Sequence, residues 1–175
     1  RLTGVVNASM FQGNGRSVGL MVEGRAVNNG ADNPAFGGFL AFDPVSSSRP
    51  QTPARPRVAV FGRDCPGFDL ASVRRDYRVV VQNYRLLDCD GRPIAWSDPK
   101  VYSAAAVGVD RTGRLVLIHS RTPYRMRDLA TMLAAPALDL RGALFVEGGP
   151  EASLLVRAGT GTVRALGSYE TGFTA

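Results

Sequence analysis

The sequence has few of the residues that build metal centres. His119 is the only histidine, and Cys65 and Cys89 are the only cysteines, with no CxxC pair. These are too few soft ligands for a zinc site. No apolar run approaches the roughly 20 residues of a membrane helix, and neither the P-loop nor the dinucleotide-binding glycine pattern occurs. We therefore expect no metal site, no membrane span and no nucleotide site of these two types.

Lysine is almost absent, although the chain is basic. Lys100 is the only lysine among 21 basic residues, the net charge is +6 and the isoelectric point is about 10.0. Such a balance can indicate nucleic-acid binding. However, the basic residues are dispersed, and aromatic residues are not interleaved with them as they are on stacking surfaces. We expect no nucleic-acid partner, whereas a basic surface does suit an anionic substrate such as a phosphodiester.

The length and composition are typical of one globular domain with a full core: 175 residues, 45% hydrophobic and 21% charged. No signal-peptide pattern opens the chain, and residues 1–4 lead at once into an apolar stretch, so we expect the sequence to begin inside a longer gene product. Residues 43–56 are rich in proline and serine. Because strands are expected on both sides, a flexible hairpin loop is favoured there over a domain linker. The expected domain covers residues 1–175.

The two cysteines both lie in loop-like sequence. Cys65 stands in RDCPG and Cys89 in DCDG. A disulfide is favoured, which would suit an exported protein, and two independent thiols are the alternative.

Alternation of apolar and polar residues, punctuated by turn residues, predicts a chain built from hairpins. The clearest hairpin joins residues 104–109 to 114–119 across an Asp-Arg-Thr-Gly turn. The fold class is expected to be α+β, a single domain with a mixed, largely antiparallel sheet and one or two helices packed on it. The remaining expected strands are 5–6, 19–22, 26–27, 36–42, 57–61, 78–82, 86–87, 144–146 and 154–156, with an edge strand or loop at 163–173.

Two helices are expected. The first is short, over residues 69–75, with Asp69 as its N-cap. The second follows Thr122-Pro123, which would supply an N-cap and a first-turn proline, and ends before Pro136. Its apolar residues recur at helical spacing: Met126, Leu129, Ala130 and Leu133.

The segment LFVEGGPEASLLV, residues 144–156, is the most informative stretch. A buried strand there delivers Glu147 directly into Gly148-Gly149-Pro150. Glycine permits a ligand to approach the backbone closely, so the carboxylate would stand beside bare N–H groups. The alternative is an ordinary turn between two strands.

Several other polar residues have a structural explanation beside a functional one. Asn7 and Ser9 follow an apolar strand and are more often local hydrogen-bond partners than catalytic groups. His119 is interpreted as a half-buried strand residue, with acid/base catalysis as the alternative. Ser153 lacks a GxSxG motif, so no hydrolase nucleophile is implied.

The order of several short motifs is more informative than any one of them. Along the chain these are VVNASMF, SVGLMVEGR, GGFLAFDP, VVVQNYRLLDCDGRP, AAAVGVDRTGRLVLIHS, a helix with DLATML, and ALFVEGGPEASLLV. This succession resembles the phosphodiester glycosidase family. In that family an INAGFF strand end, a P-x-GL hairpin, a Q-x-x-P-x-L-x-x-x-G segment, an R-x-A-x-G strand, an LA helix and an LDGG-x-S loop follow in that order. The resemblance extends from Val5 to Val156.

The chain departs from the family pattern at three places. Glu147 stands where the family usually has an aspartate, one methylene shorter. The arginine of R-x-A-x-G is replaced by Ala104, or by Ser103 in the other alignment. Tyr84-Arg85 replaces a Gly/Ser-Pro pair, and Arg85 is a candidate to supply the lost positive charge.

The resemblance implies a hydrolase that cleaves a sugar-1-phosphodiester or a related glycan linkage, secreted or in the periplasm or cell envelope of a bacterium, with no cofactor. Such chemistry needs an acid/base pair at the anomeric carbon and donors for the phosphate oxygens. The resemblance points to Glu147 and Asn7 as catalytic residues. The substrate-binding residues that it implies are Ser9, Arg85, Gly148, Gly149, Glu151 and Ser153. Because the arginine is missing, a non-catalytic glycan-binding or envelope-associated module is the alternative.

Overall fold

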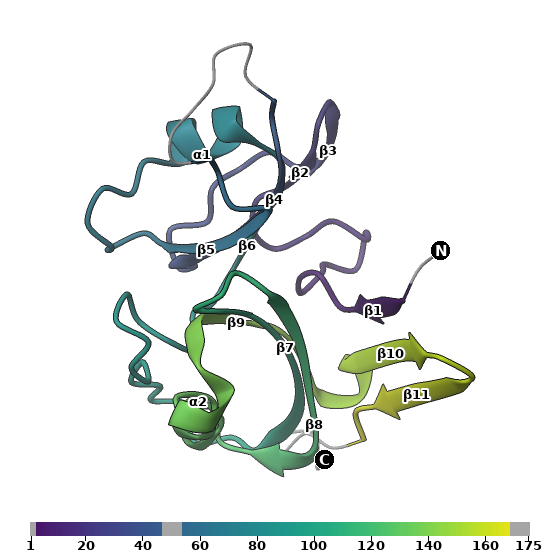
Figure 1. Ribbon diagram of the computed structural model, residues 1–175. Coiled ribbons are helices and arrows are strands. Elements are labelled where there is room, and N and C mark those ends of the chain that lie inside the picture. Colours follow the sequence, from purple (N-terminus) through teal and green to yellow (C-terminus); the bar gives the residue numbers. More distant parts are fainter. Residues whose placement is uncertain (1–2, 47–53, 169–175) are drawn as a thin grey trace.

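The chain folds into three antiparallel sheets and two α-helices over the residues that the computed structural model describes, 3–46 and 54–168 (Figure 1). The predicted α+β class, largely antiparallel and built from hairpins, is confirmed, and its strands are divided among three sheets. The expected flexible loop over 43–56 and the tail over 163–173 fall in part on residues 47–53 and 169–173, which lie outside the described residues. No helix among the described residues is long and apolar enough to cross a membrane.

The sheet at the top of Figure 1 has five strands, and helix α1 (Leu70–Asp76) leads directly into one of them. The Asp69 carboxylate accepts hydrogen bonds from the backbone N–H groups of Ala71 and Ser72, at 3.2 and 3.0 Å, so the predicted N-cap is confirmed. In spatial order the strands are β3 (Ala26–Asn29), β2 (Met21–Glu23), β6 (Tyr77–Asn83), β4 (Gly38–Pro44) and β5 (Val58–Gly62).

Two three-stranded sheets complete the fold. One carries helix α2 (Met126–Leu133) and a short 3-10 turn, η1 (Pro136–Leu138), and the other is entered through a second 3-10 turn, η2 (Gly149–Glu151). The strands of the first are β8 (Leu115–Tyr124), β7 (Tyr102–Asp110) and β9 (Leu140–Gly148), and those of the second are β1 (Gly4–Val6), β10 (Ser153–Ala158) and β11 (Gly161–Leu166).

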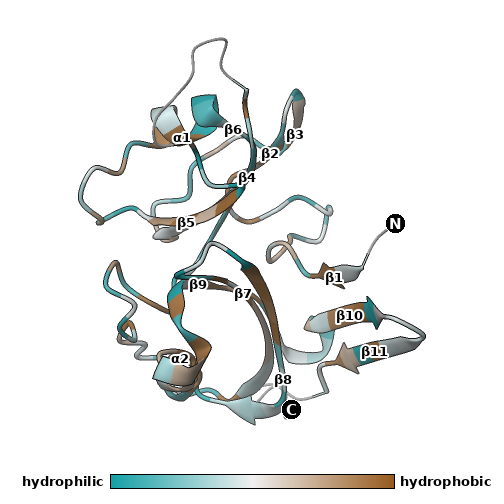
Figure 2. Ribbon diagram, in the orientation of Figure 1, coloured by the Kyte–Doolittle hydropathy of each residue, from teal (hydrophilic) through white to brown (hydrophobic). Residues whose placement is uncertain are grey.

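Strand β7 is buried along its whole length because it has the core on both faces. Its side chains alternate between the two faces: Ala104 and Ala106 pack in the cluster with α2, whereas Ala105 and Val107 pack in the cluster that contains Leu40 of β4. Small side chains suit a strand enclosed in this way. Figure 2 shows that hydrophobic residues concentrate in the strands where these layers meet.

Two local predictions are wrong. Thr122-Pro123 does not cap α2, because β8 continues to Tyr124, which pairs with Tyr102, and the helix begins after Arg125. The proline favours extended backbone at the residue before it, which suits a strand end as well as a helix start. Residues 86–87 form no strand: the chain there makes only isolated bridges, between Arg85 and Leu144 and between Leu87 and Pro93.

Candidate active site

A cavity of about 770 Å³ opens beside the end of β9. The residues that line it come from the end of β9 and the following η2, the turn after β5, the irregular segment between β6 and β7, the start of β7, and the loops that contain Met10, Ala35 and Gly37. Its walls carry four aromatic and seven charged side chains: Tyr84, Trp96, Tyr102, Phe145, Asp64, Asp98, Glu147, Glu151, Arg63, Arg85 and Lys100. Apolar walls with a few convergent polar groups are typical of a small-molecule site.

The aromatic residues contact one another in a chain along the wall. Trp96 lies edge-on to Tyr84 and to Phe145, with ring centroids 5.2 and 5.9 Å apart. Tyr102 and Phe145 follow at 6.0 Å. The Trp96 indole N–H donates to the backbone carbonyl of Arg85 at 3.1 Å, which fixes the ring. Such edge-to-face packing gives a rigid apolar wall.

Glu147 stands at the end of β9, opposite Ala105 of β7, and only 9% of it is exposed. Its Oε1 accepts a hydrogen bond from the backbone N–H of Gly148 at 3.0 Å. A Cβ at Gly148 would lie 2.9 Å from the Tyr102 ring, so the first glycine makes room for the aromatic wall. Gly149 has φ +68°, which favours glycine because the chain turns there into η2. The strand end therefore presents a carboxylate to the cavity.

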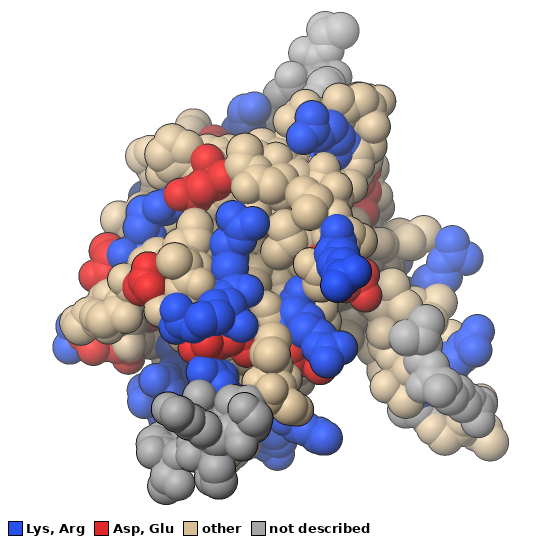
Figure 3. All heavy atoms as spheres, turned by 90° about the horizontal axis from the view of Figure 1, so that it is seen from above, with Lys and Arg blue, Asp and Glu red and all other residues tan. Residues whose placement is uncertain are grey.

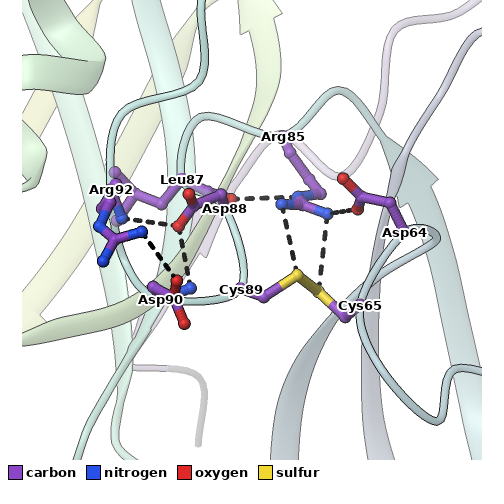
Figure 4. The surroundings of a disulfide bond; sticks show 8 residues. All are labelled: Asp64, Cys65, Arg85, Leu87, Asp88, Cys89, Asp90 and Arg92. Carbon is purple, nitrogen blue, oxygen red and sulfur yellow. Dashed lines mark hydrogen bonds and ion pairs between the residues drawn. A yellow bond between two sulfur atoms is a disulfide. The ribbon is translucent and has the colours of Figure 1, made fainter.

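Arg85 also lines the cavity, although only 4% of its side chain is exposed. Its Nε–H donates to the Leu87 carbonyl at 3.1 Å, and its Nη1 pairs with the Asp64 carboxylate. Figure 4 shows the guanidinium between Asp64 and the Cys65–Cys89 disulfide. Its nitrogens lie 3.7 Å from the Cys65 sulfur and 3.9 Å from the Cys89 sulfur.

A pair of glycines makes room for this arginine. Gly38 of β4 and Gly62 of β5 are opposite each other in the sheet. A Cβ at Gly62 would lie 1.9 Å from Nη1 of Arg85, and one at Gly38 would lie 2.6 Å from its Cγ. The absence of side chains at these two positions therefore allows a long cation to lie buried against the sheet.

The disulfide favoured by the sequence is present. It joins the turn after β5 to the segment after β6, and both of its sulfurs lie beside the Arg85 guanidinium. Asp64, Cys65 and Cys89 are also the only cluster of potential metal ligands within the described ranges. Because both sulfurs are used in the disulfide, the cluster offers a single carboxylate, which is too little for a metal site.

Arg63 is the second arginine on the cavity wall, and the Asp32 carboxylate compensates its charge. It donates two hydrogen bonds to Asp32, at 3.0 and 2.5 Å, and its guanidinium lies 5.4 Å from the centre of the Phe39 ring. The hydrogen bonds from Arg63 lower the pKa of Asp32, and the same contact raises the pKa of Arg63. Buried Gln82 also donates to Asp32, at 2.7 Å, so the carboxylate is held from two sides.

The structure brings some predicted site residues together and leaves others apart. Glu147, Gly148, Glu151 and Arg85 all line the cavity. Ala104, where the family has its arginine, is paired with Gly148 but is fully buried and is not among the lining residues. No other cation of β7 takes its place, since the strand is uncharged from Tyr102 to Val109.

Asn7, Ser9 and Ser153 do not line the cavity. The Asn7 side chain holds the segment after Glu151: its Oδ1 accepts from the Ser153 backbone N–H at 2.7 Å and from the Ser153 hydroxyl at 3.2 Å, and its Nδ2 donates to the Glu151 carbonyl at 3.2 Å. Ser9 shares a 2.8 Å hydrogen bond with the hydroxyl of Ser17.

Gly149 and His119 also lie off the cavity wall. His119 is half-buried in β8, as interpreted from the sequence, with Nε2 3.2 Å from the Ala152 carbonyl oxygen.

Sequence reasoning missed the aromatic wall and Asp64. Trp96 is the only tryptophan, and Asp64 directly precedes Cys65, so both carried a local signal. Tyr102 and Phe145 carried none, because each reads as an ordinary apolar strand residue and only the fold brings them together.

Together the fold and the cavity define an antiparallel α+β protein with an acid-bearing, aromatic-walled cavity. The chain belongs to the phosphodiester glycosidase (NAGPA) family, whose model matches residues 1–171. No curated protein sequence matches it.

Two solved structures share the fold. One is the zebrafish N-acetylglucosamine-1-phosphodiester alpha-N-acetylglucosaminidase catalytic domain, auto-inhibited by its pro-peptide, with TM-score 0.62, 16% identity, and coverage of 88% of this chain and 53% of that one. The other is a hypothetical protein from Synechocystis, with TM-score 0.52, 13% identity, and coverage of 89% and 48%. This chain therefore spans about half the length of both, and at such identities the likeness concerns the fold.

Proposed function

We propose that this chain is a hydrolase that cleaves a sugar-1-phosphodiester or a related glycan linkage. The observation that carries the proposal is the convergence of Glu147, Arg85 and an aromatic wall on one cavity, in a chain that belongs to the phosphodiester glycosidase family. An aromatic wall suits the apolar face of a sugar, a carboxylate suits acid/base chemistry, and a guanidinium suits a phosphate.

In this proposal Glu147 acts as the acid/base at the glycosidic bond. Glycoside hydrolysis commonly uses two carboxyl groups, and Glu151 on the same cavity wall is the proposed second one. The Gly148 N–H orients Glu147, since it donates to Oε1 of that side chain. Arg85 is the proposed partner of the phosphate oxygens, in place of the family arginine that Ala104 lacks.

Asn7 and Ser153 are proposed as positioning residues. Their mutual hydrogen bonds, and the bond from Asn7 to the Glu151 carbonyl, hold the backbone of η2 against β1. Asn7 therefore acts on the chemistry through the placement of Glu151. Residues 1–175 are proposed to form one domain. Within it, Ser9 and Gly149 are proposed to support the cavity without lining it.

The place of action is proposed to be outside the cell or in the cell envelope. Disulfides persist in oxidising compartments and are rare in the cytosol, and Cys65–Cys89 is such a bond. A sugar-phosphodiester polymer or conjugate of the envelope is the class of substrate that fits this place.

The test is release of free sugar from a panel of sugar-1-phosphodiesters that differ in sugar and anomer. The control substrates carry the same phosphodiester on carbon 6, where no glycosidic bond to phosphate exists. The proposal expects sugar release from at least one 1-phosphodiester and none from the 6-phosphodiesters. Release from neither, at any enzyme concentration, would contradict it.

A non-catalytic glycan-binding module is the second candidate, and the missing cation at Ala104 favours it. It predicts saturable binding of a 1-phosphodiester, measured by calorimetry, with no sugar released over long incubation. The two candidates are therefore separated by turnover on a ligand that is shown to bind.

A further inference from the structure

The two arginines on the cavity wall differ in how firmly their counter-charges are held. Asp32 accepts two hydrogen bonds from Arg63 and a third from buried Gln82. Asp64 has Arg85 as its single side-chain partner among the described residues. One carboxylate is fixed by a network, and the other is held by a single contact.

Exposure is distributed unequally between the partners of the second pair. The Arg85 side chain is 4% exposed, whereas the Asp64 side chain is 75% exposed. The Asp64 carboxylate is already hydrated in the pair, so its own hydration changes little when it moves away from Arg85. The buried guanidinium, in contrast, would be left without a counter-charge and without water, which carries a large free-energy cost. The departure of Asp64 is therefore favoured when another anion takes its place.

The arginine itself is fixed and cannot follow the carboxylate. Its Nε donates to the Leu87 carbonyl, its own carbonyl accepts from the Trp96 indole N–H, and the glycines at 38 and 62 enclose its stem and its head. The guanidinium is thus oriented by contacts that do not involve Asp64. Such preorganised donors bind an anion at low entropic cost.

We propose that Asp64 occupies the anion subsite of Arg85 until a substrate phosphate displaces it. This inference rests on the proposed function for the identity of the anion. Carboxylate and phosphate offer similar oxygen pairs to a guanidinium, so they compete for the same nitrogens. The apparent affinity for an anion is the intrinsic affinity multiplied by the fraction of time that Asp64 leaves Arg85 free. A neutral glycan brings no charge to replace Asp64.

The test is a titration of the intact protein with inorganic phosphate, followed by isothermal calorimetry at constant ionic strength. Asp64→Asn removes the competing charge and is expected to tighten phosphate binding by roughly threefold to thirtyfold, as a competitor that is bound most of the time predicts. Asp98→Asn is the matched control, since Asp98 lines the same cavity and its carboxylate accepts a hydrogen bond from the Lys100 backbone N–H instead. We expect Asp98→Asn to change the affinity for phosphate by less than about twofold, because solvent and salt screen the interaction between the phosphate and a carboxylate that does not contact Arg85.

Unchanged or weaker phosphate binding in Asp64→Asn would overturn the proposal, and so would equal gains in Asp64→Asn and Asp98→Asn. A double-mutant cycle with Arg85→Gln adds a second readout, because the gain from Asp64→Asn must disappear when Arg85 is absent. A gain that persists in the double variant would also overturn it. Phosphate binding requires no turnover, so this result is independent of the sugar-release test. Tighter phosphate binding in Asp64→Asn without any sugar release would contradict only the proposed hydrolase. Sugar release without tighter phosphate binding would contradict only the role of Asp64.

Discussion

At the scale of single residues, buried charges are tolerated where local hydrogen bonds satisfy them. Asp110 is 3% exposed and lies at the end of β7. Its carboxylate accepts from the backbone N–H groups of Thr112 and Arg114, from the Thr112 hydroxyl, and from the Arg114 side chain at 2.6 Å. The backbone hydrogen bond from Arg114 is the main cause that holds the pKa of Asp110 well below its usual range. The turn between β7 and β8 therefore depends on an ionised aspartate.

The Asp110→Asn substitution tests this dependence. A depressed folded-state pKa contributes stability that is fully present above the unfolded pKa of about 3.9 and is lost as the pH falls through the folded value. The variant is thus expected to melt several degrees below the wild type at pH 7, and the two melting curves should converge as the pH is lowered below about 4. Calorimetry over this pH range measures it. A melting difference that stays constant with pH would contradict the role of the charge.

At the scale of elements, the β4–β5 pair is shaped around Arg85. Gly38 meets Leu144 as well as the arginine, since a Cβ there would lie 2.2 Å from Leu144 Cδ2 and 3.1 Å from the Asn83 carbonyl oxygen. The strand, the arginine and β9 are packed without space for a methyl group. Substitutions in this layer therefore act on the sheet and on the cavity together.

Gly38→Ala is expected to lower the free energy of unfolding by about 1–3 kcal/mol, the usual cost of an inserted methylene in a packed core. Gly13→Ala is the matched control, because a Cβ at Gly13 would have no heavy atom within 4 Å. Urea denaturation of both variants measures the difference. Equal stability of the two would show that the layer relaxes freely.

Elements and site were predictable from the sequence to different degrees. Hairpins such as β7–β8 and the Asp69 cap were predictable because their signals are local. The start of α2 was not, since Thr122-Pro123 suits a strand end as well as a helix start, and the pairing of Tyr124 with Tyr102 decides between them. Glu147 was found from the strand that runs into Gly148-Gly149, and Arg85 from its departure from the family motif. The aromatic wall was not, because it is assembled from separate segments by long-range packing.

At the scale of the whole molecule, acidic and basic side chains are dispersed over the surface. Figure 3 shows acidic side chains among the arginines on the upper face, and several surface arginines have an acidic partner, such as Arg75 with Asp76 and Arg92 with Asp90. Exposed pairs of this kind contribute little to stability.

The disulfide, in contrast, connects the five-stranded sheet to the segment that leads into β7.

Removal of the disulfide by the double substitution Cys65→Ser and Cys89→Ser is expected to lower the free energy of unfolding by about 3 kcal/mol, from the entropy that its loop regains in the unfolded chain. Because Cys65 adjoins Asp64, the same variant is also expected to bind phosphate differently from the wild type. Urea denaturation measures the first effect and calorimetry the second. Full stability in the variant would contradict a structural role for the bond.

The central claim is that Glu147 performs acid/base chemistry in the cavity. It is tested most directly by the kcat of sugar release from the best 1-phosphodiester, compared between wild type, Glu147→Gln and the exposed control Glu23→Gln. Loss of an acid/base group typically costs a factor of 100 or more, so Glu147→Gln is predicted to lower kcat by at least about 100-fold at an unchanged melting temperature. Glu23→Gln is predicted to remain as active as the wild type. Equal kcat in wild type and Glu147→Gln would contradict the account.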